Sequence, residues 1–398
     1  MKLLVVCQYY YPENFQITPI CEHLAKEGDS VTVLTGLPNY PTGIIPDEYK
    51  KGRRDEFING VHVIRCNEIG RKKGALYLGI NYLSYMLSAA CMIGKLDIDF
   101  DLVFVYQLSP VLMAIPGLRY AKKYKVPVFL YCCDLWPESI KMYIKNESNI
   151  VFKIVDRISK RIYSNVNRIA CQSSSFLTYF QKVHGIPRNK LTYLPAFADE
   201  TYLAQDFSPI GENVNFVFLG NLGIAQNLIS VLKAVDKIKE VPGFVVHFVG
   251  DGSVLNEMKV FVYNHGLQEI VRFYGRRPVE EMPAFYKLAD ACLVSLKADN
   301  QTGLTLPSKV QGYMAAGKTI IGMIDGSTKE VVEESGCGAC VAANDIDGFA
   351  ELLKDFILHK EKYDNCGNNG RAYFKKHFCK DKFMERLRLE LEHLKQYE

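Results

Sequence analysis

A short stretch in the C-terminal half, residues 304–318, combines residue types that suit the binding of an anion. Pro307 and Ser308 favour the first turn of a helix, and Gly317 suits its C-terminal end. A helix N-terminus attracts phosphate, because its N–H groups are unpaired and its dipole is positive there. Lys309 falls in that first turn, where a cation is unfavourable unless an anion offsets it. The pattern predicts that Pro307, Ser308 and Lys309 contact a phosphate; a solvated surface lysine is the alternative.

A glycine loop earlier in the same half suggests a second contact to that anion. The loop reads Gly220, Asn221, Leu222 and Gly223. It follows an apolar run and precedes a helical stretch that begins at Gln226, so its backbone N–H groups could bind a diphosphate. The loop does not match G-x-G-x-x-G, and the chain has no Walker motif. These absences argue against NAD binding and ATP hydrolysis.

In the N-terminal half, two carboxylates follow an apolar run at 128–133. Asp134 and Glu138 therefore fall where α/β proteins tend to form their sites, beyond the end of a strand. A carboxylate there could bind a substrate hydroxyl or accept its proton, although a helix-capping role for Asp134 is an alternative. Trp136, the only tryptophan, could stack on the ring of a ligand or fill the core.

The elements that must position these residues alternate between strands and helices. Apolar runs and helical stretches follow one another from residue 3 onward, and the same alternation restarts after Asp199. This pattern predicts two doubly wound α/β domains with parallel sheets, facing across a cleft. The expected domains are 1–197 and 198–372. A last helix at 373–398 could pack back on the first domain.

Composition limits the partners. Residues 1–195 contain 25 Lys/Arg against 16 Asp/Glu, a net charge of +9, and residues 196–398 contain 23 against 28, a net charge of −5. The basic half suggests an anionic partner, such as a membrane surface or a lipid diphosphate. A nucleic acid is less favoured, since the basic residues are spread out and no recognised module is present. Scattered solvated lysines are the alternative.

Two features bear on the compartment. The cysteines lie inside apolar runs and do not form a disulfide framework, which predicts a reducing compartment, the cytoplasm. The uncharged segment 74–94 is long enough to cross a bilayer, but its serines, asparagine and tyrosines favour a buried or interfacial helix. We therefore expect peripheral attachment to the inner face of the cytoplasmic membrane through two flanking basic clusters: Lys50, Lys51, Arg53, Arg54, Arg71, Lys72 and Lys73.

Motifs along nearly the whole chain resemble retaining glycosyltransferases of family 4. In the C-terminal half these are 220–226, 249–252 and 272–276; in the N-terminal half, 11–15, 36–43 and 134–139 resemble the branch that builds capsule, colanic acid and O-antigen, including N-acetylfucosamine transferases. The resemblance implies the GT-B fold, a metal-independent hexosyl transfer, and a nucleotide-diphosphate sugar, often UDP-linked, as donor. It also implies that domain 198–372 binds the nucleotide, that domain 1–197 binds the acceptor, a lipid-diphosphate-linked saccharide, and that no cofactor is used. An N-acetylated deoxyhexosamine is a candidate sugar.

The chain departs from the family pattern at the donor site. The two glutamates of the wider family correspond to Leu304 and Gly312, and the usual Arg and Lys correspond to Asn221 and Gln226. Charge compensation for the diphosphate must then come from elsewhere, and Lys309 is the candidate. A non-catalytic sugar-nucleotide-binding or scaffold subunit is the alternative function.

These considerations assign a role to each candidate residue. We expect catalytic roles for Asp134 and Lys309, and no metal ligands. The expected acceptor contacts are Glu13, Asn14, Asn39, Tyr40, Trp136 and Glu138. The expected donor contacts are Gly220, Asn221, Leu222, Gly223, Gln226, Gly250, Asp251, Arg276, Pro307, Ser308 and Lys309.

Overall fold

The computed structural model describes residues 1–72, 74–96, 98–142, 144, 146–208, 211–297 and 304–396. Lys73 of the expected basic cluster, and the end of the last expected helix at Tyr397, lie outside these residues. The chain forms two compact units. Unit 1 comprises Met1–Leu194 and Met384–Glu398, and unit 2 comprises Pro195–Phe383. The division therefore falls at Leu194, where the sequence analysis places it at 197.

Unit 1 is built on an eight-stranded sheet with the order β3-β4-β2-β1-β5-β6-β7-β8. All neighbours are parallel except β3 and β4. The strands are β1 (Lys2–Val6), β2 (Ser30–Thr35), β3 (Asp55–Ile58), β4 (Val61–Arg65), β5 (Leu102–Gln107), β6 (Val128–Cys132), β7 (Arg168–Cys171) and β8 (Leu191–Tyr193). The central strands are buried throughout, because helices cover both faces.

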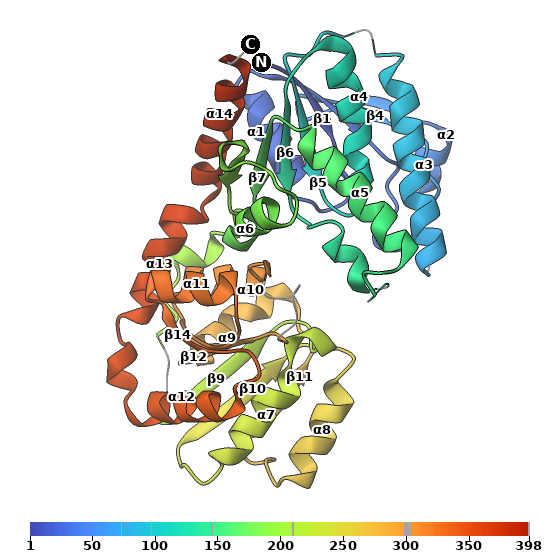
Figure 1. Ribbon diagram of the computed structural model, residues 1–398. Helices are drawn as coiled ribbons and strands as arrows, with labels where there is room; N and C mark the ends of the chain where they lie inside the picture. Colours follow the sequence, from blue (N-terminus) through green and yellow to red (C-terminus); the bar gives the residue numbers. More distant parts are fainter. Residues whose placement is uncertain are drawn as a thin grey trace. The chain divides into compact units, whose positions relative to one another are not determined.

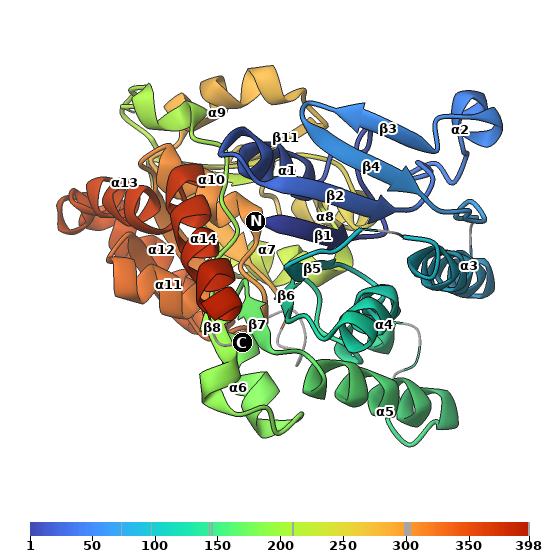
Figure 2. The same ribbon diagram turned by 90° about the horizontal axis from the view of Figure 1, so that it is seen from above.

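The helices of unit 1 lie between these strands along the chain. They are α1 (Ile17–Lys26), α2 (Asp47–Lys51), α3 (Ala75–Ile93), α4 (Ile115–Tyr124), α5 (Ile150–Ser164) and α6 (Ser174–Lys182). Figure 2 shows α1 on one face of the sheet and α3 and α4 on the other. The parallel order confirms the doubly wound fold expected from the alternation of strands and helices.

Unit 2 repeats this architecture with a six-stranded, fully parallel sheet of order β11-β10-β9-β12-β13-β14. Its strands are β9 (Val214–Leu219), β10 (Phe244–Val249), β11 (Val271–Gly275), β12 (Ala291–Ser295), β13 (Thr319–Met323) and β14 (Gly338–Val341). Its helices are α7 (Leu228–Lys237), α8 (Leu255–Asn264), α9 (Met282–Leu288), α10 (Ser308–Ala315), α11 (Ser327–Ser335), α12 (Ile346–Leu358) and α13 (Cys366–His377). Two apolar clusters, around Phe216 and around Val217, bury the two faces of this sheet.

The C-terminal segment is two helices rather than the single expected one. Helix α13 ends at His377 and α14 (Lys380–Gln396) follows (Figure 1). Phe378 stands at the break and is fully buried in the core of unit 2. Beyond residue 383, α14 belongs to unit 1, where Arg388 pairs with Asp29 at 2.6 Å and Glu390 pairs with Arg168 at 2.6 Å.

Candidate functional site

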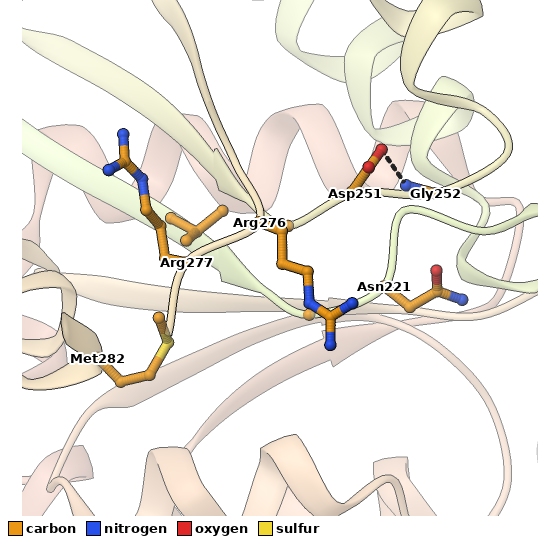
Figure 3. A pocket seen from close by; sticks show the side chains of 9 residues that line it. Asn221, Asp251, Gly252, Arg276, Arg277 and Met282 are labelled. Atoms are coloured by element: carbon orange, nitrogen blue, oxygen red, sulfur yellow. Dashed lines mark hydrogen bonds between the residues drawn. The ribbon is translucent and has the colours of Figure 1, made fainter. Parts of the chain in front are cut away.

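A pocket of about 620 Å³ lies in unit 2 at the carboxyl ends of β9, β10 and β11. Each of these parallel strands ends in a loop that contributes to it, as expected for a binding site in an α/β sheet. The pocket is lined by Gly220, Asn221, Val249, Gly250, Asp251, Gly252, Arg276, Arg277 and Met282 (Figure 3). Five of these residues are among the donor contacts expected from the sequence: Gly220, Asn221, Gly250, Asp251 and Arg276.

Two glycines make the close approach of the first two loops possible. Gly220 has φ 127° and Gly250 has φ 147°, a region that L side chains rarely adopt. A Cβ at Gly250 would lie 1.8 Å from the carbonyl oxygen of Gly220, so no side chain fits there. Both glycines are among the donor contacts expected from the sequence. Glycine is required at position 250 because its backbone lies against the backbone of Gly220.

The glycine loop offers fewer N–H donors than expected. Gly220 N donates to Val249 O and Leu222 N donates to Asp251 O, both at 2.9 Å. These two groups already have partners, so the expectation that the whole loop donates to a diphosphate is too broad. The N–H groups of Asn221 and Gly223 have no backbone partner among the described residues.

Lys309 is the expected donor residue with the most unusual surroundings. Its Nζ donates to Gln226 Oε1 at 2.8 Å and lies 3.7 Å from the centre of the Phe218 ring. A Cβ at Gly220 would lie 3.3 Å from this Nζ, so the ammonium is next to the glycine that lines the pocket. Burial lowers the pKa of Lys309 to about 7, and no carboxylate pairs with it among the described residues. A partly desolvated cation without a counter-ion is a strong candidate for binding an anion.

Helix α10 begins and ends where the sequence predicts. Pro307 is its N-cap, Ser308 is its first residue, and Gly317 adopts φ 65° just beyond its end. Gln226 does not begin a helix, contrary to the prediction from the sequence. Helix α7 begins at Leu228, because Asn227 takes a left-handed conformation. Gln226 instead ends a short 3₁₀ turn, from which its side chain reaches Lys309.

The structure accounts for one departure from the family pattern. A Cβ at Gly312 would lie 2.9 Å from the hydroxyl oxygen of Tyr286, which is itself buried. The space that a side chain at position 312 needs is therefore occupied by the Tyr286 hydroxyl.

The arginines at the end of β11 differ in their orientation. In Figure 3 the Arg276 side chain extends toward Asn221, whereas that of Arg277 extends to the other side. Arg277 Nε donates to Tyr274 O at 3.1 Å, and Nη1 lies 3.6 Å from Glu281. Asp251 Oδ1 accepts from Gly252 N at 2.7 Å. The sequence analysis omitted Arg277 and Met282, although the Arg276–Arg277 pair directly after a strand was a usable signal.

In unit 1, Asp134 follows β6 and is tied to the neighbouring strand end. Its Oδ2 accepts from Ser109 Oγ at 2.7 Å, and Trp136 Nε1 donates to the same Ser109 Oγ at 3.1 Å. Burial raises the pKa of the Asp134 carboxyl, against the hydrogen bonds from Ser109. The next helical turn begins only at Glu138, so Asp134 does not cap it. Trp136 is buried, as its core-filling alternative predicts.

Glu138 is already compensated by its neighbours. It accepts from the Tyr179 hydroxyl at 2.8 Å and pairs with Lys141 at 2.7 Å. His184 Nε2 donates to Trp136 O at 3.0 Å, which fixes the same loop. The expected contact of Glu138 with the acceptor stays a prediction.

The four other expected acceptor residues fall into one loop region at the ends of β1 and β2. Glu13 Oε1 accepts from Asn39 N at 2.8 Å and from Tyr40 N at 2.6 Å. Tyr40 is 45% exposed and its ring packs on Phe15 at 5.3 Å. Asn14 is exposed at the surface of this region.

A carboxylate that the sequence analysis missed lies beneath them. Glu68, after β4, is bound by the side chains of Gln8, Asn39 and Asn81. These partners lie 60, 29 and 13 positions away in the chain, so no local motif reveals them.

Within the described ranges, no group of three or more His, Cys, Asp or Glu side chains could hold a metal ion.

Comparison with known proteins shows that both units match described domains. Residues 15–196 match the family described as glycosyl transferase 4-like domain, and residues 204–373 match glycosyl transferases group 1. The chain is a glycosyltransferase. In this glycosyltransferase the first matched domain corresponds to unit 1 and the second to unit 2.

Relatives and solved structures agree with this assignment. The glycosyltransferase is 26% identical over 262 residues to the probable glycosyltransferase WbjE of Pseudomonas aeruginosa, covering 62% of this chain and 63% of that relative. The match thus spans less than two thirds of WbjE. This chain is also 22% identical over 386 residues to the putative colanic acid biosynthesis glycosyl transferase WcaI of Escherichia coli (strain K12). That match covers 90% of this chain and 92% of WcaI.

A solved structure confirms the fold class. HepE of Anabaena in complex with UDP superposes with a TM-score of 0.71 at 13% identity, over 99% of this chain and 100% of that one. This likeness shows two Rossmann-like units in the GT-B arrangement of elements, as the sequence analysis predicts.

Proposed function

We propose that this glycosyltransferase moves a sugar from a nucleoside-diphosphate sugar, with UDP as the nucleotide, to a saccharide linked to a lipid diphosphate. The product would belong to a cell-surface polysaccharide. The observation that carries the donor part is Lys309, a half-buried ammonium with no carboxylate partner among the described residues, beside Gly220 of the pocket. The UDP bound to HepE and the colanic acid pathway named for WcaI support the nucleotide and the product class.

The donor diphosphate would lie between Lys309, the start of α10 and the Asn221 loop. Lys309 and the N–H groups at the helix N-terminus stabilise negative charge, which grows on the diphosphate as the sugar departs. Arg276, which extends toward Asn221, adds a second cation (Figure 3). No metal ion is required for this charge compensation, because the protein supplies the cations itself.

The transfer would proceed with retention. The bond between the anomeric carbon and the diphosphate oxygen breaks, and the acceptor oxygen forms the new bond on the same face. The proton of the acceptor hydroxyl passes to the departing diphosphate. Asp134 in unit 1 would accept a hydrogen bond from the acceptor and orient it.

The direct test measures transfer of labelled sugar to a lipid-diphosphate saccharide, preceded by a thermal-shift screen against UDP-, GDP- and dTDP-sugars. UDP-linked N-acetylated deoxyhexosamines belong in the first panel. Lys309→Ala should lower kcat by about 10²-fold, more than it weakens nucleotide binding, because its interaction strengthens toward the transition state. Lys309→Arg should restore activity only in part, since the guanidinium presents a different geometry. Wild-type kcat in Lys309→Ala contradicts the donor site, and UDP binding without any transfer favours a non-catalytic subunit.

We also propose that unit 1 attaches to an anionic membrane surface, and that α5 rather than the expected cluster near residue 50 provides the basic contacts. Lys50 pairs with Asp47, and Arg53 pairs with Glu48 and Glu56, so two of the four cations near residue 50 are neutralised. On α5, four exposed basic side chains form no ion pair among the described residues: Lys153, Arg157, Lys160 and Arg161.

Apolar side chains accompany this basic face. Ile150 and Ile154 of α5 are 69% and 51% exposed. Part of α3, Leu76–Ile93, is the one described helix long and apolar enough to cross a membrane, a test that core helices also pass. Leu76 and Leu87 of this helix are exposed. Basic residues that attract lipid phosphates, next to apolar residues that enter the interface, are typical of peripheral attachment.

A further inference from the structure

Glu68 is a buried carboxyl at the carboxyl edge of the unit 1 sheet, where the ends of β1, β2 and β4 meet. It is 7% exposed, and its partner Gln8 is 1% exposed. Glu68 Oε1 accepts from Gln8 Nε2 at 2.8 Å, Asn39 Nδ2 at 3.1 Å and Asn81 Nδ2 at 2.5 Å. One oxygen therefore joins the loops after β1, β2 and β4 to helix α3.

The other oxygen has no such partners. Glu68 Oε2 is buried and has no hydrogen bond among the described residues. It lies against the backbone at Gly36, where a Cβ would be only 1.7 Å away. An ionised carboxylate is acceptor-only on both oxygens, and leaving one buried without a donor is costly. A proton on Oε2 removes the buried charge, and a neutral carboxyl costs far less to bury than a carboxylate.

The charged groups around Glu68 do not favour its ionised form. Glu13 and Tyr9 face it from the loop after β1, Cys66 faces it from the end of β4, and Tyr85 faces it from α3. None of these is a cation, and no ion pair involves Glu68 in the described part of the chain. Burial raises the pKa of Glu68 to about 8, although its three amide donors oppose the shift.

We propose that Glu68 acts as a neutral carboxylic acid and is the positioning residue for the acceptor side of the site. This inference rests on the proposed acceptor function of unit 1. Through Asn39, Glu68 fixes a loop whose next residue, Tyr40, presents an exposed ring. Asn39 Oδ1 also accepts from Arg71 N at 3.0 Å, and the Arg71 guanidinium lies over the Tyr40 ring at 5.7 Å. An exposed aromatic ring beside a cation suits a sugar and its linked phosphate.

The first test is thermodynamic and needs no substrate. A carboxyl whose folded pKa lies near 8, above its unfolded value of about 4.5, stabilises the fold most at low pH. The stabilisation that this carboxyl contributes decreases as the pH rises from about 4.5 to about 8, and it does not change further above pH 8. Glu68→Gln keeps the shape and the neutral charge, so its Tm should rise by several degrees relative to wild type between pH 5 and pH 8. A constant difference across this range overturns the proposal.

Glu138→Gln is the matched control for this measurement. It makes the same substitution at a buried glutamate of unit 1, but one paired with Lys141 at 2.7 Å. Its Tm should fall below that of wild type at pH 8, because the ion pair is lost there. An increase in both variants would assign the effect to glutamine rather than to the protonation of Glu68.

The second test is kinetic. Glu68→Ala should raise the KM for the lipid-linked acceptor about tenfold, with nucleotide affinity unchanged, while Glu68→Gln stays near wild type at pH 7. Equal losses in both variants would show that the ionised form is needed and overturn the proposal, as would an unchanged acceptor KM in Glu68→Ala. If Glu68→Ala does not fold, Glu68→Gln against wild type decides. If the wild type transfers no sugar to this acceptor, the proposed function fails, while the pH dependence of the Tm still tests the neutral state of Glu68.

Discussion

Lys309 lies in surroundings that normally exclude a charged side chain, with a phenyl ring on one side and a neutral amide as its hydrogen-bond partner. The absence of family-typical cations at Asn221 and Gln226 made the sequence point to this lysine. The sequence could not show that Gln226, 83 positions away, would become its partner. Gln226, which stands where the family has a cation, thus accepts a hydrogen bond from Lys309, the cation expected to replace it.

Nucleotide binding should be coupled to proton uptake by Lys309. Burial lowers its pKa to about 7 in the unliganded protein, and a bound diphosphate raises that pKa again by opposing the charge loss. Affinity should therefore be greatest below pH 7 and fall by up to about tenfold per pH unit above it. Calorimetric titration of UDP in two buffers of different ionisation enthalpy measures the proton uptake. Lys309→Ala should abolish this component, and an unchanged pH dependence in that variant contradicts the assignment.

Asp134 is expected to act on the acceptor and not on the donor. It belongs to unit 1, and its carboxyl already bonds Ser109, so Asp134→Asn preserves the shape and one hydrogen bond. The transfer rate should fall by about 10²-fold while UDP affinity stays near wild type. Steady-state transfer alongside calorimetry separates the two effects. Full turnover in Asp134→Asn would return this residue to a structural role.

At the scale of elements, the strands and helices that carry the site were predictable because they repeat a periodic pattern. The limits of α10 followed from Pro307, Ser308 and Gly317, whose backbone preferences act locally. The start of α7 was placed two residues early, because the left-handed conformation of Asn227 leaves no apolar signal. The network around Glu68 was missed for another reason: its members come from three strand ends and a helix, which only the folded sheet brings together.

The close approach of the β9 and β10 loops can be tested with one methyl group. Gly250→Ala combines a disfavoured φ of 147° with a contact of 1.8 Å to Gly220 O, so the pocket must distort. Stability should fall by more than the about 1–3 kcal/mol of backbone strain, and UDP affinity should weaken with it. Gly243→Ala is the control, since it has φ 82° but nothing within 4 Å of its Cβ. Equal losses of stability in the two variants, measured by denaturant unfolding, would show that the contact is unimportant.

At the scale of the molecule, the excess of positive charge in the N-terminal half predicts an anionic partner. Which basic side chains are available to bind that partner depends on the ion pairs they form within the protein. Two of the four cations near residue 50 form ion pairs, whereas the four exposed cations of α5 form none in the described part of the chain. Lys153→Glu with Arg157→Glu should reduce binding to anionic vesicles by tenfold or more, given on the order of 1 kcal/mol per basic residue. Lys50→Glu with Lys51→Glu should have a smaller effect. Vesicle flotation at low and high salt measures both, and equal binding to neutral and anionic vesicles would rule out this surface.

The last helix has a consequence for the order in which the protein is made. Unit 1 includes residues 384–398, and Arg388 reaches back 359 positions to Asp29 and 361 positions to Glu27. The first 194 residues are synthesised long before this helix exists, so Asp29 has only the N-terminal ammonium of Met1 as its cationic partner while all of unit 2 is synthesised. The unit that is translated first is therefore the unit that is completed last. During that interval unit 1 is most exposed to chaperones and proteases, and a premature stop near the end of the reading frame would damage the start of the protein.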